Sequence, residues 1–133
     1  AYDRIQDDLC VEIMLQVAGY LIDNTDRRLI LLDGRTFSRR DHITPLIEAT
    51  QQLSIPLIVI ECRCSDETAL RRIAGDHAAQ EHPAANRDTD LYRRIKARRE
   101  PLTVPHLTVD TDQSLETCLT QVLHYLERHL TPD

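Results

Sequence analysis

A carboxylate and three arginines at the end of an apolar run are the residues whose types and spacing best suit chemistry. Four apolar residues, 29–32, lead into Asp33, and Arg35, Arg39 and Arg40 follow it closely. A short apolar run between turn signals is typical of a strand buried on both faces of a parallel sheet. Ligands of such sheets lie at the carboxyl ends of strands, and arginine forks match phosphate geometry. The stretch therefore predicts a site for an anionic, phosphate-bearing ligand.

Asp33 has two interpretations. Its carboxylate could hold Mg²⁺ through water or act as a base toward a hydroxyl group. It could equally cap the turn that follows the strand, because single acidic residues after strands are common. The three arginines favour the first interpretation, since cations at a helix start oppose the helix dipole and suggest that they serve a ligand.

A second group of arginines flanks a polar stretch. Arg71 and Arg72 end a helix that leads into residues 75–90, and Arg87 lies on the far side of this stretch. We interpret residues 75–90 as a lid-like excursion, whose arginines could close over a transferring phosphoryl group. The alternative is that Arg71 and Arg72 only stabilise the carboxyl end of their helix.

Two cysteines and two histidines approach the spacing of a zinc finger: Cys62, Cys64, His77 and His82. However, C-x-C on a strand places both side chains on one face, whereas a zinc knuckle needs a chelating turn. The pattern therefore favours two ordinary thiols and two surface histidines.

Length and composition limit the class of protein. The 133 residues suit one domain, and the net charge of −6 argues against general binding to nucleic acid or to an anionic membrane. No apolar segment is long enough to span a bilayer, so we expect no membrane partner. Four cysteines in a domain of this size do not resemble a secreted disulfide framework, which favours a cytoplasmic protein.

Helical and strand patterns alternate along the chain. We expect helices over residues 2–24, 38–53, 65–73, 91–99 and 114–130, with N-caps at Ser38, Ser65 and Ser114, and strands over residues 29–33, 57–62 and 106–110. This alternation predicts a single α/β domain, residues 1–133, with a parallel sheet and right-handed crossovers.

The phosphate-binding loop of nucleotide kinases is missing. That loop requires G-x-x-x-x-G-K-S/T, so that backbone N–H groups cradle the phosphates and the lysine reaches them. The chain has three glycines, Gly19, Gly34 and Gly75, and no lysine follows any of them.

The order of these features resembles that of a known family. The run L-D-G-R-T-F-S-R-R, residues 32–40, is similar to the I-L-D-A-T-F…R segment of P-loop predicted kinases of the AAA type, relatives of polynucleotide 5′-hydroxyl kinase and zeta toxin. Further similarities follow in the same order at residues 60–62, 70–72, 88–92, 100–102 and 105–111. The resemblance covers nearly the whole chain.

The resemblance implies a three-layer α/β fold of the P-loop nucleoside-triphosphate hydrolase type, with a mainly parallel sheet. The sheet would be incomplete, because the central first strand and the phosphate loop are absent, and the chain would be the C-terminal part of a kinase domain. A missing N-terminal segment, a homodimer, or direct pairing of residues 29–33 with 57–62 would complete the sheet.

The resemblance also implies roles for individual residues. Asp33 is the strand-end acid that orders Mg²⁺ indirectly, and Arg71, Arg72 and Arg87 are catalytic arginines that stabilise phosphoryl charge. Arg35, Arg39 and Arg40 are expected to bind substrate, while Asp110 and Thr111 would lie near the adenine of ATP. Asp76 departs from the family, whose members often carry a further lid arginine there.

The expected function is therefore ATP- and Mg²⁺-dependent phosphoryl transfer to a hydroxyl of a small molecule or nucleotide. The isolated chain is expected to be inactive, because it lacks the phosphate loop. The alternative is a non-catalytic α/β interaction module that oligomerises through its incomplete sheet.

Overall fold

The computed structural model describes residues 4–26, 29–33, 37–79 and 89–130. The contacts divide the chain into two compact units, Ala1–Leu57 and Ile58–Asp133, and each unit is described by itself. No helix in these described ranges is long and apolar enough to cross a lipid bilayer.

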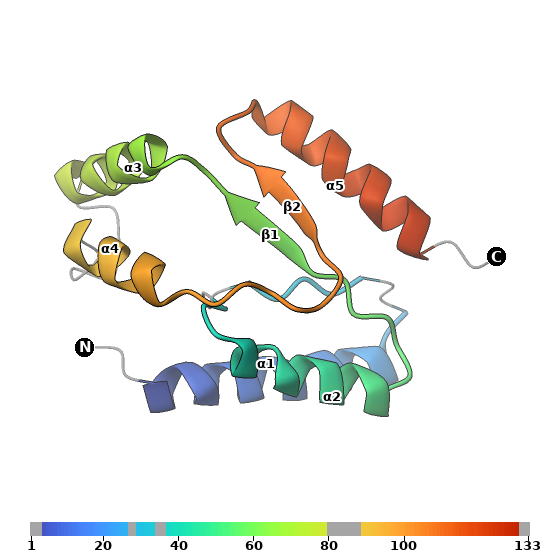
Figure 1. Cartoon of the computed structure of the whole chain (residues 1–133). Helices are drawn as coiled ribbons and strands as arrows, with labels where there is room; N and C mark the ends of the chain where they lie inside the picture. The colour runs from blue at the N-terminus through green and yellow to red at the C-terminus, as the bar shows by residue number, and fades with distance from the viewer. Residues whose placement is uncertain (1–3, 27–28, 34–36, 80–88, 131–133) are drawn as a thin grey trace. The chain divides into compact units, whose positions relative to one another are not determined.

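The first unit contains a pair of helices. Helix α1, Arg4–Asn24, packs beside α2, Thr44–Gln52, and a short 3₁₀ turn, η1, Arg40–His42, precedes α2 (Figure 1). Apolar residues recur along α1 at helical spacing, which predicts this helix correctly. The buried residues from this pair and the turn between η1 and α2 are Val11, Ala18, Ile43 and Leu46.

Two predictions for the first unit are wrong. Residues 29–33 do not form a strand. A strand requires a neighbouring strand for its hydrogen bonds, and the described part of residues 1–57 offers none. Ser38 does not cap α2. The helix begins after Ile43 without a side-chain cap, and Pro45 lies in its first turn, where the fixed backbone angle of proline favours a helix start.

The second unit is built on two parallel strands. Strand β1, Ile60–Arg63, pairs in register with β2, Leu107–Asp110, and these are the two strands among the described residues. Helix α3, Asp66–Ala79, and helix α4, Thr89–Arg98, lie between the strands in the chain, and α5, Leu115–Leu130, follows β2 (Figure 1). The parallel pairing is confirmed, while the larger three-layer sheet of the P-loop type stays a prediction.

The two faces of this sheet differ in polarity. Residues that pair across the strands share a face, so Cys62 and Val109 lie on one side while Glu61 and Thr108 lie on the other. Val109 is the most deeply buried core residue, with 2% of its surface exposed. Helix α5 packs beside β2 (Figure 1). The thiol of Cys118 on α5 donates to the carbonyl of Asp110 at 3.4 Å.

Capping serines fix the starts of two helices in this unit, as the sequence predicts. The hydroxyl of Ser65 accepts the N–H of Thr68 at 3.2 Å at the start of α3. The hydroxyl of Ser114 accepts the N–H of Thr117 at 3.2 Å at the start of α5.

The lid-like stretch is shorter than predicted. Helix α3 continues to Ala79 and α4 begins at Thr89, so residues 75–79 and 89–90 are helical. Gly75 does not end α3, because one glycine inside a helix costs only about 1 kcal/mol. Residues 80–88 lie outside the described residues.

Candidate functional site

The carboxyl ends of β1 and β2 bring together residues from four parts of the second unit. Arg63 and Asp110 are paired at these ends, and the capped starts of α3 and α5 follow directly. Open α/β sheets bind ligands at this edge. We call the residues gathered there the strand-end cluster: Ser65, Thr68, Arg71, Arg72, Asp110, Thr111 and Asp112.

Thr111 joins both strands to α3. Its N–H and its hydroxyl donate to the carbonyl of Arg63 at 2.7 Å and 2.9 Å. Arg72 on α3 donates to the hydroxyl and to the carbonyl of Thr111 at 3.0 Å and 2.7 Å. Arg72 and Thr111 were predicted separately as catalytic and cofactor-binding residues, and the structure places them in direct contact.

Asp112 completes the start of α3. One carboxylate oxygen accepts the N–H of Ser65 at 2.9 Å. The hydrogen bond from the Thr68 hydroxyl, together with that from Ser65, holds the pKa of Asp112 below its ordinary value of 3.8. Arg71 also donates to the hydroxyl of Thr68, at 3.2 Å. The carboxylate therefore adds to the two acidic residues of the first turn, Asp66 and Glu67, at a helix start where the helix dipole favours anions.

Asp110 shapes the turn after β2. Its carboxylate accepts the N–H of Asp112 at 3.0 Å, which is an Asx-type turn. The turn orients the backbone so that Thr111 and Asp112 reach toward α3. The cluster thus presents two arginines and two carboxylates at one edge of the sheet. Because a guanidinium has five N–H donors, Arg72 can contact a phosphate while it holds Thr111.

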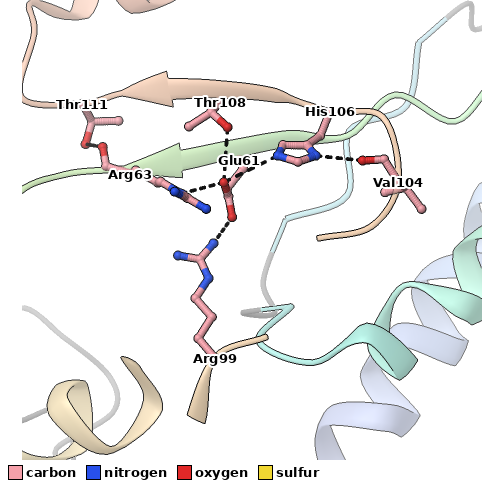
Figure 2. A network of polar contacts seen from close by, with 7 residues as sticks. All are labelled: Glu61, Arg63, Arg99, Val104, His106, Thr108 and Thr111. Atoms are coloured by element: carbon pink, nitrogen blue, oxygen red, sulfur yellow. Dashed lines mark hydrogen bonds and ion pairs between the residues drawn. The ribbon is translucent and has the colours of Figure 1, made fainter. Parts of the chain in front are cut away.

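A buried carboxylate that the sequence analysis did not single out as a site residue lies on the polar face of the sheet. Only 5% of the Glu61 side chain is exposed, and its oxygens face the guanidinium groups of Arg63 and Arg99 (Figure 2). The Arg63 Nε lies 2.6 Å from Glu61 Oε2, and Arg99 donates to Oε1. The sequence does offer one indication of this network. Glu61 lies within an apolar strand, and buried glutamates are rare unless they are paired with a cation.

Two residues of the β2 region complete this Glu61 network, which consists of Glu61, Arg63, Arg99, His106 and Thr108. The Thr108 hydroxyl donates to Glu61 Oε2 at 3.3 Å (Figure 2). The His106 Nε2 lies 3.8 Å from the same oxygen, while its Nδ1 lies 2.8 Å from the carbonyl of Val104. The contact with the carboxylate is too long for a hydrogen bond.

The network keeps Glu61 ionised. Burial alone raises the pKa of Glu61, but the hydrogen bond from Arg63 and the charge of Arg99 outweigh burial, and the pKa falls below its ordinary value of 4.5. A carboxylate held in this state by two cations is poorly suited to act as a general base at neutral pH. The Glu61 network therefore serves to hold the segment after α4 against the sheet.

A second polar contact joins α4 to α3. The Tyr92 hydroxyl donates to Asp66 at 2.6 Å, and the Lys96 ammonium group pairs with the same carboxylate. The hydrogen bond to Asp66 raises the pKa of Tyr92 to about 12. Tyr92 therefore remains protonated, which excludes it as a base near neutral pH.

The remaining predicted site residues belong to the first unit or lie outside the described residues. Asp33 is exposed and lies in the first unit, as do Arg39, which pairs with Asp41 at 3.0 Å, and Arg40 in η1. Arg35 and Arg87 lie outside the described residues.

The described residues do not contain a cluster of three or more histidine, cysteine or carboxylate side chains that could hold a metal ion. Cys62 and Cys64 are free thiols, and His82 of the spacing that approaches a zinc finger lies outside the described residues. A lone carboxylate such as Asp33 suits Mg²⁺ only where phosphates supply further ligands.

Comparison with known proteins identifies no relative. No protein-family model, no curated protein and no solved structure matches this chain. The strand-end cluster is therefore the feature of this chain that bears on its function.

Proposed function

We propose that this chain is a nucleotide-binding part of an ATP-dependent phosphotransferase of the P-loop kinase type, acting in the cytoplasm on a hydroxyl of a small molecule or nucleotide. The observation that carries the proposal is the contact between Arg72 and Thr111 at the carboxyl ends of two parallel strands. Ligands of α/β sheets bind at this position, and an arginine held there suits a phosphate group.

The strand-end cluster supports binding more directly than it supports catalysis. Arg71 and Arg72 can supply positive charge to phosphates, and the turn from Asp110 to Asp112 offers polar groups to a base or ribose. The chain contains no phosphate loop, so phosphoryl transfer in this proposal needs that loop in addition to these residues. Mg²⁺ would accompany ATP and neutralise charge on its phosphates.

The test is binding of ATP to the chain as it stands. Saturating Mg²⁺-ATP is expected to raise the melting temperature by about 5 °C, because a ligand that binds only the folded state adds free energy of unfolding. Arg72→Ala is expected to remove most of this rise. Melting is followed by circular dichroism with and without ATP, so that a loss of intrinsic stability in the variant is separated from the loss of binding.

Arg128→Ala is the matched control, because Arg128 is an exposed arginine near the end of α5. It should retain the full ATP-dependent rise. No rise in the unmodified chain, or an equal rise in Arg72→Ala, would contradict the proposed site. Magnesium-dependent conversion of ATP to ADP by this chain would contradict the expected inactivity.

The alternative function, an interaction module, is favoured by a different observation. Within the described residues the sheet has two strands, so β1 and β2 each have one edge without a strand partner. Unpaired edges can accept strands from another chain. Light scattering coupled to size exclusion distinguishes the functions: a dimer indifferent to ATP favours the interaction module, and a monomer stabilised by ATP favours the phosphotransferase.

A further inference from the structure

Helix α4 carries a concentration of positive charge in an acidic chain. The net charge of the chain is −6, yet the seven residues 93–99 contain five cations: Arg93, Arg94, Lys96, Arg98 and Arg99. These cations divide into two sets. Lys96 and Arg99 are paired with carboxylates of the same unit, Asp66 and Glu61, and Arg93 pairs with Asp90 on α4 itself at 3.5 Å.

Arg94 and Arg98 belong to the other set. Both are exposed, and neither makes a hydrogen bond or ion pair with another residue of the described ranges. Four residues separate them in the chain, so they lie one turn apart on the same side of α4. Their charges therefore contribute no ion pair to the second unit among the described residues.

Apolar side chains lie beside these two arginines. Leu91 and Ile95 occupy positions that adjoin Arg94 and Arg98 at helical spacings of three and four residues. Ile95 is 37% exposed and no residue of α4 is buried. We call this surface, formed by Leu91, Arg94, Ile95 and Arg98, the α4 face. It combines the two guanidinium groups with the apolar side chains of Leu91 and Ile95.

We propose that the α4 face is a docking surface for an acidic peptide segment that carries an apolar residue. Charge complementarity favours a carboxylate-rich partner, because each guanidinium can bind a carboxylate through two hydrogen bonds. Ile95 provides the apolar contact that a helical recognition surface uses as an anchor. The proposal is independent of the nucleotide site at the strand ends.

Nucleic acid suits the same surface less well. Its backbone offers phosphates to the arginines but has no apolar group for Ile95. Base stacking requires an available aromatic ring, and Tyr92, the aromatic residue of α4, is half-buried and held by Asp66. The net negative charge of the chain also opposes the approach of a long polyanion.

The test measures binding of a fluorescein-labelled peptide of repeating Glu-Glu-Leu triplets to the full chain by anisotropy. Binding is expected to weaken strongly between about 50 mM and about 500 mM salt, because exposed charges are screened. The R94E/R98E variant should bind at least about tenfold more weakly than the unmodified chain. Glutamate is a good helix former, and circular dichroism verifies that the helix content is unchanged.

Three comparisons make the result specific. R128E changes an exposed arginine on α5 and should bind like the unmodified chain. R94K/R98K keeps the positive charge but loses the planar guanidinium group. Its affinity for the peptide should lie between those of the unmodified chain and R94E/R98E. A Gln-Gln-Leu peptide should not bind. No binding of the acidic peptide, equal binding by R94E/R98E, or tighter binding of oligothymidylate through the same arginines would each overturn the proposal.

Discussion

Glu61→Gln is expected to lower the free energy of unfolding by about 2 kcal/mol, because it removes the negative charge that pairs with Arg63 and Arg99 and replaces one acceptor oxygen by an NH₂ group, which cannot accept a hydrogen bond. The loss is smaller than the roughly 3–5 kcal/mol that breaking a fully buried ion pair costs. Arg63 and Arg99 are 52% and 34% exposed, so water can solvate them once the carboxylate is gone. Urea denaturation followed by circular dichroism measures the change.

Glu48→Gln is the matched control for this substitution. Glu48 is an exposed glutamate on α2, and removing its charge should change the unfolding free energy by less than about 0.5 kcal/mol. Equal effects of the two substitutions would show that the Glu61 network contributes little to stability.

The pH dependence gives the same network a second test. The pKa of Glu61 in the folded chain lies below its ordinary value of 4.5, so the unfolded chain binds the proton more readily. The stabilisation by the carboxylate is therefore fully present above pH 4.5 and is lost as the pH falls through the folded pKa. The stability difference between the unmodified chain and Glu61→Gln should accordingly shrink below pH 4.5. A difference that stays constant down to acid pH would contradict this assignment.

Val109→Asp is expected to prevent folding of the second unit, with a loss of more than about 4 kcal/mol. Val109 is 2% exposed and faces the apolar side of β2, opposite Cys62 in the register. An aspartate there must either bury an unpaired charge or pull β2 away from its neighbours. Hydrogen exchange should show lost protection in β1, β2 and α5, while α1 and α2 of the first unit keep theirs.

Leu119→Asp is the matched control, because Leu119 is 51% exposed on α5. Replacing this half-exposed leucine by aspartate should cost about 1 kcal/mol, from the lower helix propensity of aspartate and the loss of partial apolar burial. If Leu119→Asp unfolds the second unit as completely as Val109→Asp, the assignment of Val109 to the core is wrong.

The sequence predicted the local elements of this protein well. The helix from residue 4 to 24, the capping roles of Ser65 and Ser114, and the strands near residues 60 and 107 follow from patterns of a few neighbouring residues. Such patterns are reliable because helix periodicity and N-caps depend on contacts within one turn. The apolar run at residues 29–33 predicted a strand wrongly, because a strand depends on a partner that local composition cannot supply.

The stretch from Asp33 to Arg40 predicted a phosphate site. Its described residues belong to the first unit. The strand-end cluster instead joins residues that are distant in the chain. Arg72 and Thr111 are 39 positions apart, and Ser65 and Asp112 are 47 apart. The sequence predicted Arg72 and Thr111 as separate site residues through the family resemblance, and that functional assignment stays a prediction.

By itself the sequence determined where helices occur along the chain, the caps at Ser65 and Ser114, and that arginine supplies nearly all the positive charge. Only the tertiary structure decided which carboxylate each arginine meets. Glu61 and Arg99 are 38 positions apart, and they meet because parallel pairing of β1 and β2 brings the segment before β2 back across the polar face of the sheet. Ion pairs of this kind depend on the register of the strands, which no short pattern of residues specifies.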